Sequence, residues 1–326
     1  MTPDPLAPLL EVEDLTITYA SDGGTLQALR GANLVARAGE VIGIVGESGC
    51  GKSTLASALI NLLASNARVT SGAVRFRGQD ILTLPDEAKR RIRGRHIAMV
   101  FQDPMTAFNP VLPLGDQMVD YQHHLALPRR EKRARACAML ARVGIPDADL
   151  VMKRFMHELS GGMRQRAAIA SALLMTPEVL VADEPTTALD VTMEAQIIHL
   201  LRELRHDHQG TIIVVTHHLG VVGELCDRVY VMYAGQVVEE GLVDDIYHAP
   251  RHPYTAALIA CDPAHLETHT PVLPTIPGRL PDLTAPPKGC AFAARCTKVT
   301  ARCQSEPPPW VRVSATQAAL CHEVTP

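Results

Sequence analysis

The sequence is poor in several features that would mark other classes of protein. Aromatic residues make up only 4% of the chain, so aliphatic side chains must fill most of a core drawn from 47% hydrophobic residues. No run of about 18 apolar residues occurs, which argues against a helix that spans a membrane. The net charge of −4 gives no electrostatic reason to expect a nucleic-acid partner. The 326 residues suffice for one α/β domain of roughly 200–250 residues and a smaller piece.

The N-terminal stretch MTPDPLAPLLEVEDL lacks a basic segment ahead of an apolar one. We therefore expect no secretory signal and a cytosolic chain. Eight cysteines in that compartment are not expected to form disulfides. Four of them are scattered, and the other four lie within the last 37 residues at Cys290, Cys296, Cys303 and Cys321.

A glycine-rich stretch at residues 46–54, GESGCGKST, fits the phosphate-loop pattern G-x-x-x-x-G-K-[ST]. The apolar run at 41–45 predicts a buried strand and residues 52–63 predict a helix, which disfavours a chance glycine-rich turn. Backbone N–H groups of such a loop and the helix N-terminus attract phosphate. We expect nucleotide binding by Gly46, Ser48, Gly49, Cys50, Gly51, Lys52 and Ser53. Lys52 is expected at the β- and γ-phosphates, and the Ser53 hydroxyl on Mg²⁺.

Hydrophobic periodicity predicts alternating strands and helices along the rest of the chain. Residues 10–19 alternate as an edge strand would, and further strands are predicted at 26–36, 74–76, 98–102, 179–182 and 212–215, with a hairpin at 229–239. Residues 104–157 indicate a helical, basic insertion, and 160–175 and 192–205 predict strong helices. Proline becomes frequent after Pro250, which places a domain boundary there.

Two acidic residues follow the predicted buried strand at 179–182. Phosphoryl transfer needs a metal site and a positioned water. Asp183 at the strand end suits the hydration shell of Mg²⁺, and strand alternation aims Glu184 at the other side of the phosphate site, which suits a base for the attacking water. Taken alone, the pair fits a solvated turn at least as well.

The segment LSGGMRQR at 159–166, followed by VLVADEPTTALD at 179–190, resembles the motifs of ATP-binding subunits of ABC transporters. The resemblance covers residues 9–245. It implies an α/β fold with a P-loop (RecA-like) core, an antiparallel β subdomain, a helical subdomain insertion and a small irregular C-terminal extension. The implied domains are a nucleotide-binding domain at 1–250, with the helical subdomain at about 104–160, and an extension at 251–326.

The resemblance also implies roles for single residues. At the nucleotide, Tyr19 would stack on adenine, Thr54 would donate to the α-phosphate, and Asp183 and Gln102 would bind Mg²⁺. Glu184 would be the catalytic base, Gln102 would also touch the water, and His217 would clamp the γ-phosphate. Ser160, Gly161 and Gly162 would bind the γ-phosphate of an opposite subunit, because Ser160 is a natural N-cap and glycines allow close approach of N–H groups. Asp190 would cross that dimer interface.

Two positions depart from the family pattern. Met163 stands where the family often has glutamine, and His218 stands where an acidic residue is more common. We keep the γ-phosphate role on His217, because it directly follows the strand. With Lys52, Glu184 and His217 present, a competent ATPase is predicted.

The C-terminal part carries HAPRHPYTAALI at 248–259, which resembles a motif of ATPases from peptide importers. GCAFAARC at 289–296 resembles the cysteine segment of that subfamily. Four thiolates in a proline-rich tail could hold a [4Fe–4S] cluster or a Cys₄ zinc, or the cysteines could pack as small hydrophobes. The spacing is wider than usual for zinc and the subfamily includes members with a cluster, so we expect iron–sulfur at Cys290, Cys296, Cys303 and Cys321.

The expected function is that of an ATP-hydrolysing subunit powering import of di- or oligopeptides, with ATP, Mg²⁺ and the iron–sulfur cluster as ligands. The alternatives are an importer ATPase for nickel or glutathione, or a soluble ABC ATPase outside transport. The implied partners are a second, paralogous ABC ATPase, two transmembrane permease subunits and an extracytoplasmic binding protein, without nucleic acid. The implied location is the cytoplasmic face of the membrane, as a peripheral protein.

Overall fold

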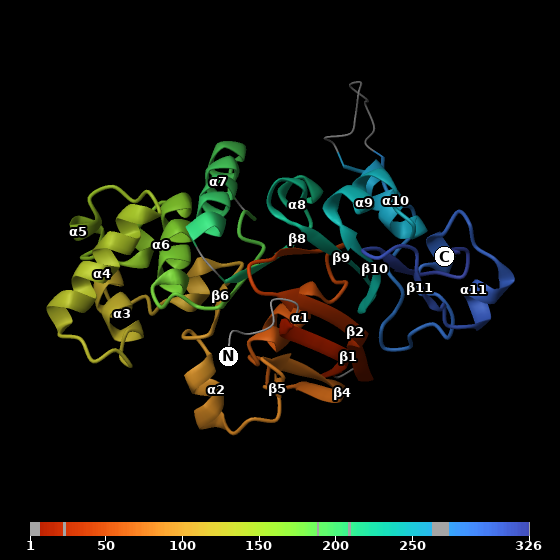
Figure 1. Ribbon diagram of the computed structural model, residues 1–326, viewed down its shortest axis with the longest axis horizontal. Coiled ribbons are helices and arrows are strands. Elements are labelled where there is room, and N and C mark those ends of the chain that lie inside the picture. The colour runs from red at the N-terminus through yellow and green to blue at the C-terminus, as the bar shows by residue number, and fades with distance from the viewer. Residues whose placement is uncertain (1–6, 22–23, 188, 208–209, 263–273, 326) are drawn as a thin grey trace. The chain divides into compact units, whose positions relative to one another are not determined.

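The computed structural model describes residues 7–21, 24–187, 189–207, 210–262 and 274–325. The chain divides into two compact units (Figure 1): residues 1–84 with 215–326 form unit 1, and residues 85–214 form unit 2. Both contain strands and helices, so the α/β class predicted from the sequence is confirmed. None of the helices in the described ranges is long and apolar enough to cross a membrane.

Unit 1 combines two sheets with short helices. Its elements are β1 (Pro8–Ser21), β2 (Gly24–Arg37), β3 (Val41–Val45), α1 (Lys52–Leu59), β4 (Ala67–Phe76), β5 (Gln79–Asp80), α8 (Leu219–Leu225), β9 (Arg228–Tyr233), β10 (Gln236–Leu242), α9 (Val243–His248), α10 (Pro253–Ala260), η4 (Ala293–Arg295), α11 (Ala301–Ser305), β11 (Trp310–Arg312) and β12 (Ala318–Leu320).

The first sheet of unit 1 is antiparallel, with the order β2-β1-β4-β5. The prediction of an edge strand at 10–19 is wrong, because β1 pairs with β2 on one side and with β4 on the other. Alternation reports that one face of a strand is buried, as with Leu15 and Ile17 here, but it does not report how many neighbours the strand has.

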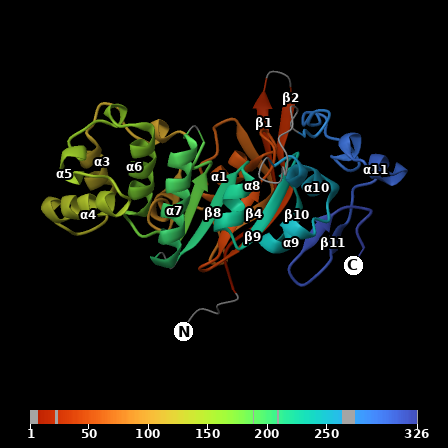
Figure 2. The ribbon, with the colours of Figure 1, turned by 90° about the horizontal axis from the view of Figure 1, so that it is seen from above.

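The second sheet places β3 next to β9, in the order β11-β12-β10-β9-β3 within unit 1. The β3 strand is parallel to β9, and all five of its apolar residues are buried. The predicted β9–β10 hairpin is confirmed, and its turn residues Ala234 and Gly235 have φ values of 47° and 79°, as a type I′ turn requires. Helix α9 packs on both strands (Figure 2).

Helix α1 is shorter than predicted. It ends at Leu59 rather than near residue 63, because Asn61 adopts a left-handed φ of 52° and turns the chain away. Asparagine is one of the few residues other than glycine that tolerates this conformation at the end of a helix.

Unit 2 is mainly helical. Its elements are α2 (Asp86–Ile92), β6 (Ile97–Val100), η1 (Pro104–Ala107), α3 (Leu114–Tyr121), α4 (Arg129–Arg142), α5 (Ala148–Val151), η2 (Met156–Glu158), α6 (Gly161–Leu173), β7 (Val179–Asp183), α7 (Val191–Asp207) and β8 (Thr211–Thr216), whose last two residues belong to unit 1. Helix α4 packs against α3, α5 and α6, as the yellow-green group in Figure 1 shows. The β6 and β7 strands pair in parallel, and β7 is buried throughout.

Candidate nucleotide site

The phosphate loop joins β3 to α1, as predicted, and its glycines are required by close packing. Gly46 has a φ of 153°, and a Cβ atom there would lie 2.2 Å from the Met232 carbonyl oxygen. Gly51 has a φ of 107°, and its Cβ atom would lie 2.5 Å from the carbonyl oxygen of Ala28. Since atoms cannot approach this closely, both positions exclude any residue with a side chain.

Lys52 begins α1, and its side chain is directed back to the loop. The residue is only 5% exposed, and its Nζ donates to the carbonyl oxygens of Gly46 at 2.7 Å and Glu47 at 3.2 Å. A buried ammonium group is costly unless it is hydrogen-bonded, so these carbonyls fix its position. Ser53, the next residue, is exposed at the start of the helix.

The remaining predicted residues of the loop differ in exposure. Ser48 and Gly49 are exposed at its tip, whereas Cys50 is fully buried, and burial raises the pKa of its thiol. The Cys50 N–H donates to the Glu47 carbonyl oxygen at 3.2 Å. Tyr19 lies on β1 with its hydroxyl 3.3 Å from the Thr54 hydroxyl, so the structure brings this predicted adenine-stacking residue to the loop helix.

His217 directly follows β8, as predicted, and is exposed. Its ring meets that of His218 edge to face, with 4.4 Å between the centroids. The backbone N–H of His218 donates to the Thr216 hydroxyl at 3.0 Å, which holds the turn between β8 and α8.

Within unit 2, the structure brings Gln102 and Glu184 together. The Gln102 amide donates to Glu184 Oε2 at 3.1 Å, and the Thr187 hydroxyl donates to the same oxygen at 2.8 Å. Glu184 has a left-handed φ of 47°, which ends the strand geometry after Asp183. Asp183 is 5% exposed at the end of β7. Thr187 is not predicted from the sequence. The one signal that could have indicated it is its place three residues after Glu184.

The segment LSGGMRQR at 159–166, called the signature segment below, leads into α6. Ser160 caps this helix as predicted, because its hydroxyl accepts from Met163 N at 3.4 Å. A Cβ atom on Gly162 would lie 1.6 Å from the terminal methyl group of Met193 on α7, so a larger residue there would require the Met193 side chain to move. Gly161 is exposed beside it. Asp190 accepts from Met193 N at 2.9 Å and caps α7.

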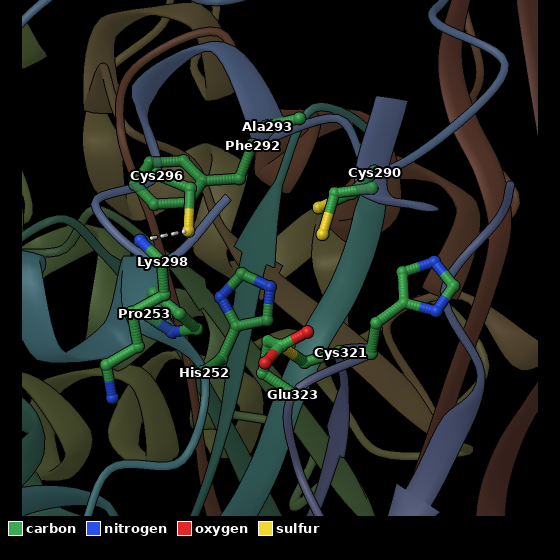
Figure 3. Close-up of a pocket in the computed structure, with 11 residues that line it drawn as sticks. His252, Pro253, Cys290, Phe292, Ala293, Cys296, Lys298, Cys321 and Glu323 are labelled. Atoms are coloured by element: carbon green, nitrogen blue, oxygen red, sulfur yellow. Dashed lines mark hydrogen bonds between the residues drawn. The ribbon is translucent and has the colours of Figure 1, made fainter. Parts of the chain in front are cut away.

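The predicted [4Fe–4S] cluster is wrong. The ranges that the structure describes hold no group of three or more His, Cys, Asp or Glu side chains placed to bind a metal ion, so the zinc alternative has no ligand set there either. The four C-terminal cysteines do line one pocket with His252 and Phe292, but Figure 3 shows Cys290 and Cys296 on different sides of it. All four cysteines, Cys290, Cys296, Cys303 and Cys321, are free.

The surroundings of three of the thiols favour their neutral form in this structure. Burial raises the pKa of Cys290, Cys296 and Cys321, which favours the protonated thiol over the thiolate that metals bind. Cys296 Sγ accepts from the backbone N–H of Lys298 at 3.3 Å, and Cys303 Sγ lies 3.3 Å from the Thr300 hydroxyl. Cys303 and Cys321 are buried, Cys290 and Cys296 are half-buried, and all four are free, which is closest to the third interpretation of the sequence.

Two family models match separate parts of the chain. The model for ABC transporters matches residues 29–187, and the model for the oligopeptide/dipeptide transporter C-terminal region matches residues 238–303. A model for an AAA domain matches residues 153–223.

Curated proteins match nearly the whole chain. The chain is 46% identical over 307 residues to the oligopeptide transport ATP-binding protein OppD of Salmonella typhimurium, covering 94% of this chain and 91% of that protein. It is 46% identical to the dipeptide transport ATP-binding protein DppD of Bacillus subtilis, over 88% of this chain and 86% of the relative.

Solved structures agree with the fold. The ATP-binding cassette MJ0796, in a dimeric post-hydrolysis state bound to ADP and Pi, aligns with a TM-score of 0.65 and 30% identity, covering 72% of this chain and 98% of the cassette. The CbiO1 cassette of Clostridium perfringens aligns with a TM-score of 0.62 and 33% identity, over 74% of this chain and 91% of that one. The predicted P-loop fold and ATPase activity are therefore confirmed, and the chain belongs to the ATP-binding proteins of ABC transporters, in the group that carries the oligopeptide/dipeptide transporter C-terminal region.

Proposed function

We propose that this protein hydrolyses ATP to power the import of oligopeptides or dipeptides through an ABC transporter. The observation that carries the proposal is the 46% identity to an oligopeptide transport ATP-binding protein over 94% of the chain. The C-terminal region at 238–303 supports the same substrate class. Neither observation favours nickel, glutathione or a role outside transport.

The phosphate loop and the start of α1 would hold the nucleotide. We assign Lys52 to the β- and γ-phosphates, Ser53 to Mg²⁺, Thr54 to the α-phosphate and Tyr19 to the adenine. The backbone of Gly46, Ser48, Gly49, Cys50 and Gly51 would surround the phosphates. Support comes from the two glycine positions that exclude side chains and from an ammonium group already held at the loop.

Each of the three residues expected at Mg²⁺, Ser53 in unit 1 and Gln102 and Asp183 in unit 2, carries a donor group that suits this ion. A serine hydroxyl at Ser53, an amide at Gln102 and a buried carboxylate at Asp183 offer the hard oxygen atoms that this ion prefers. When bound, Mg²⁺ neutralises charge that develops on the transferred phosphoryl group.

Glu184 is assigned as the base that accepts the proton of the attacking water. Gln102 and Thr187 both donate to its Oε2 oxygen, which fixes the carboxylate in one orientation. The exposed ring of His217 is assigned to the γ-phosphate.

The signature segment and Asp190 would serve a second cassette. Ser160, Gly161 and Gly162 lie at the N-terminus of the 13-residue α6, where N–H groups and the helix dipole favour an anion such as a γ-phosphate. Asp190, exposed at the start of α7, would lie at that dimer interface. Assembly with a paralogous ATPase, two permease subunits and an extracytoplasmic binding protein, on the cytoplasmic face of the membrane, completes the proposal. The domain limits 1–250, about 104–160 and 251–326 stay predictions within it.

Glu184→Gln tests this assignment in the reconstituted transporter. We expect ATP hydrolysis and uptake of a labelled peptide to fall together by about 100-fold or more, with ATP binding retained, because the amide cannot accept the proton. Glu203→Gln is the matched control, since Glu203 is an exposed glutamate on α7 paired with His199 at 3.4 Å. Uptake that continues at the normal rate in Glu184→Gln would contradict the proposal.

A further inference from the structure

Glu47, the second residue of the phosphate loop, is held by residues from the C-terminal region. Its carboxylate accepts two hydrogen bonds from Arg295, at 2.8 Å from Nη1 and 3.0 Å from Nη2. Its backbone N–H donates to the Tyr254 hydroxyl at 2.9 Å. Its carbonyl oxygen accepts from Lys52 Nζ at 3.2 Å. One residue thus connects the C-terminal region to the lysine of the loop.

Arg295 has little freedom to move. Its side chain is 5% exposed, and the Glu47 carboxylate raises its pKa, so it keeps its charge. Its other donors bind the carbonyl oxygens of Pro277 at 2.8 Å and Ile276 at 3.1 Å, and the Tyr233 hydroxyl at 3.3 Å. A planar guanidinium that donates hydrogen bonds from Nε, Nη1 and Nη2 fixes a carboxylate in both position and orientation.

Tyr254 is equally fixed. It is fully buried on α10, and its ring lies 4.6 Å from that of Tyr233 and 5.4 Å from that of Phe292, between centroids. The residues before it are anchored by the buried Glu239 carboxylate, which accepts from the N–H groups of Arg251 at 2.7 Å and His252 at 2.9 Å. The core of the C-terminal region therefore sets the place of the Tyr254 hydroxyl.

The same region also approaches the tip of the loop. The Leu280 side chain would lie 3.7 Å from a Cβ atom on Gly49, and the Leu283 carbonyl oxygen accepts from Gln27 N on β2 at 2.9 Å. Glycine-rich loops can adopt many backbone conformations, so a loop that is held before the nucleotide arrives loses less entropy on binding.

We propose that the C-terminal region positions the phosphate loop, with Arg295 and Tyr254 holding Glu47 so that the carbonyl oxygens of Glu47 and Gly46 fix the Lys52 ammonium. Arg295 and Tyr254 are positioning residues, since neither is assigned to the nucleotide. The inference rests on the proposed role of Lys52 at the phosphates. It gives the C-terminal region a direct part in ATP use.

The first test measures ATP hydrolysis by the reconstituted transporter whose cassette carries Arg295→Gln. We expect the KM for ATP to rise about tenfold and kcat to stay within about twofold. In this variant the phosphate loop is less ordered before ATP binds, but it can still adopt its bound conformation around ATP. Arg295→Lys, which keeps the charge but not the bidentate geometry, should give an intermediate KM. Arg302→Gln is the control, because Arg302 is an exposed arginine of the same region with its own partner, Glu306 at 3.3 Å.

A double variant separates positioning from general loss of stability. If Arg295 acts through Glu47, Glu47→Gln should raise KM as Arg295→Gln does, and the two changes together should cost no more than one alone. Tyr254→Phe keeps the ring packing and removes only the acceptor of the Glu47 N–H. In nucleotide-free protein, it should speed hydrogen exchange at residues 46–52 while exchange in β9 stays unchanged.

An unchanged KM in Arg295→Gln, or an equal rise in Arg302→Gln, would overturn the inference. Additive effects of Glu47→Gln and Arg295→Gln would overturn it too. Lys52→Ala distinguishes its failure from failure of the proposed function. If Lys52→Ala abolishes ATP binding while Arg295→Gln leaves KM unchanged, only the positioning role fails. If Lys52→Ala binds ATP normally, the assignment of the phosphate site itself fails.

Discussion

At the scale of single residues, the phosphate loop requires glycine at two positions because of close packing and not only because of backbone conformation. Gly46 and Gly51 combine a positive φ with backbone oxygen atoms where a Cβ atom would lie. Gly78, in the turn between β4 and β5, has a similar φ of 77° but no atom within 4 Å of its Cβ position. The three positions allow the steric cost to be separated from the conformational cost.

We predict that Gly51→Ala lowers the free energy of unfolding by about 2 kcal/mol more than Gly78→Ala does. Both variants bear the cost of a left-handed alanine, about 1–2 kcal/mol, but only Gly51→Ala must also displace the Ala28 carbonyl. Urea unfolding of both variants measures the difference. Equal losses would mean that the loop relaxes around the added methyl group.

At the scale of elements, α10 is attached to β10 by one buried carboxylate. Glu239 is completely buried, and burial raises its pKa while the hydrogen bonds that it accepts oppose that shift. Besides two backbone N–H groups, it accepts from Gln317 Nε2 at 3.0 Å, which ties the segment before β12 to the same point. Three pieces of chain thus share one anion.

Glu239→Gln is expected to lower the free energy of unfolding by about 2 kcal/mol. An amide presents one NH₂ group where the carboxylate presented a second oxygen, so at least one buried donor loses its acceptor. Glu240→Gln is the control, because that half-buried neighbour pairs with the exposed Arg312 at 3.6 Å, a contact worth about 1 kcal/mol or less. Thermal unfolding of the two variants compares them, and a similar small loss in both would contradict the anchoring role.

At the scale of the whole molecule, stability should depend on pH through His252. This residue is 1% exposed, and burial lowers its pKa to about 4. Its neutral ring accepts from Tyr254 N at 3.0 Å, which requires Nδ1 to be unprotonated. The unfolded chain binds a proton near pH 6.5 and the folded chain only near pH 4, so stability falls as pH drops between those values.

We predict that His252→Asn removes about 2 kcal/mol of the loss in stability between pH 7 and pH 5. Asparagine can still cap α10 but does not titrate, so the variant should show a flatter pH dependence even if it is less stable at pH 7. Urea unfolding at both pH values gives the comparison. If the parent protein and His252→Asn lost the same stability between pH 7 and pH 5, protonation of His252 would not destabilise the folded state and the prediction would be wrong.

The sequence by itself determined the features that are carried by neighbouring residues. The phosphate loop, the Ser160 cap and the buried strands at 41–45 and 179–183 appear where the pattern predicts them, because each depends on local backbone geometry or on the period of apolar residues. The family motifs also located Gln102 and Glu184, although not the hydrogen bond between them.

Only the tertiary structure decided which distant groups meet. Arg295 and Glu47 lie 248 residues apart in the chain, and no periodicity relates them. β1 has an inner place in its sheet because β4 pairs with it, which its own alternation cannot report. Cys290, Cys296, Cys303 and Cys321 come from separate parts of the C-terminal chain, and only the fold brings all four to line one pocket.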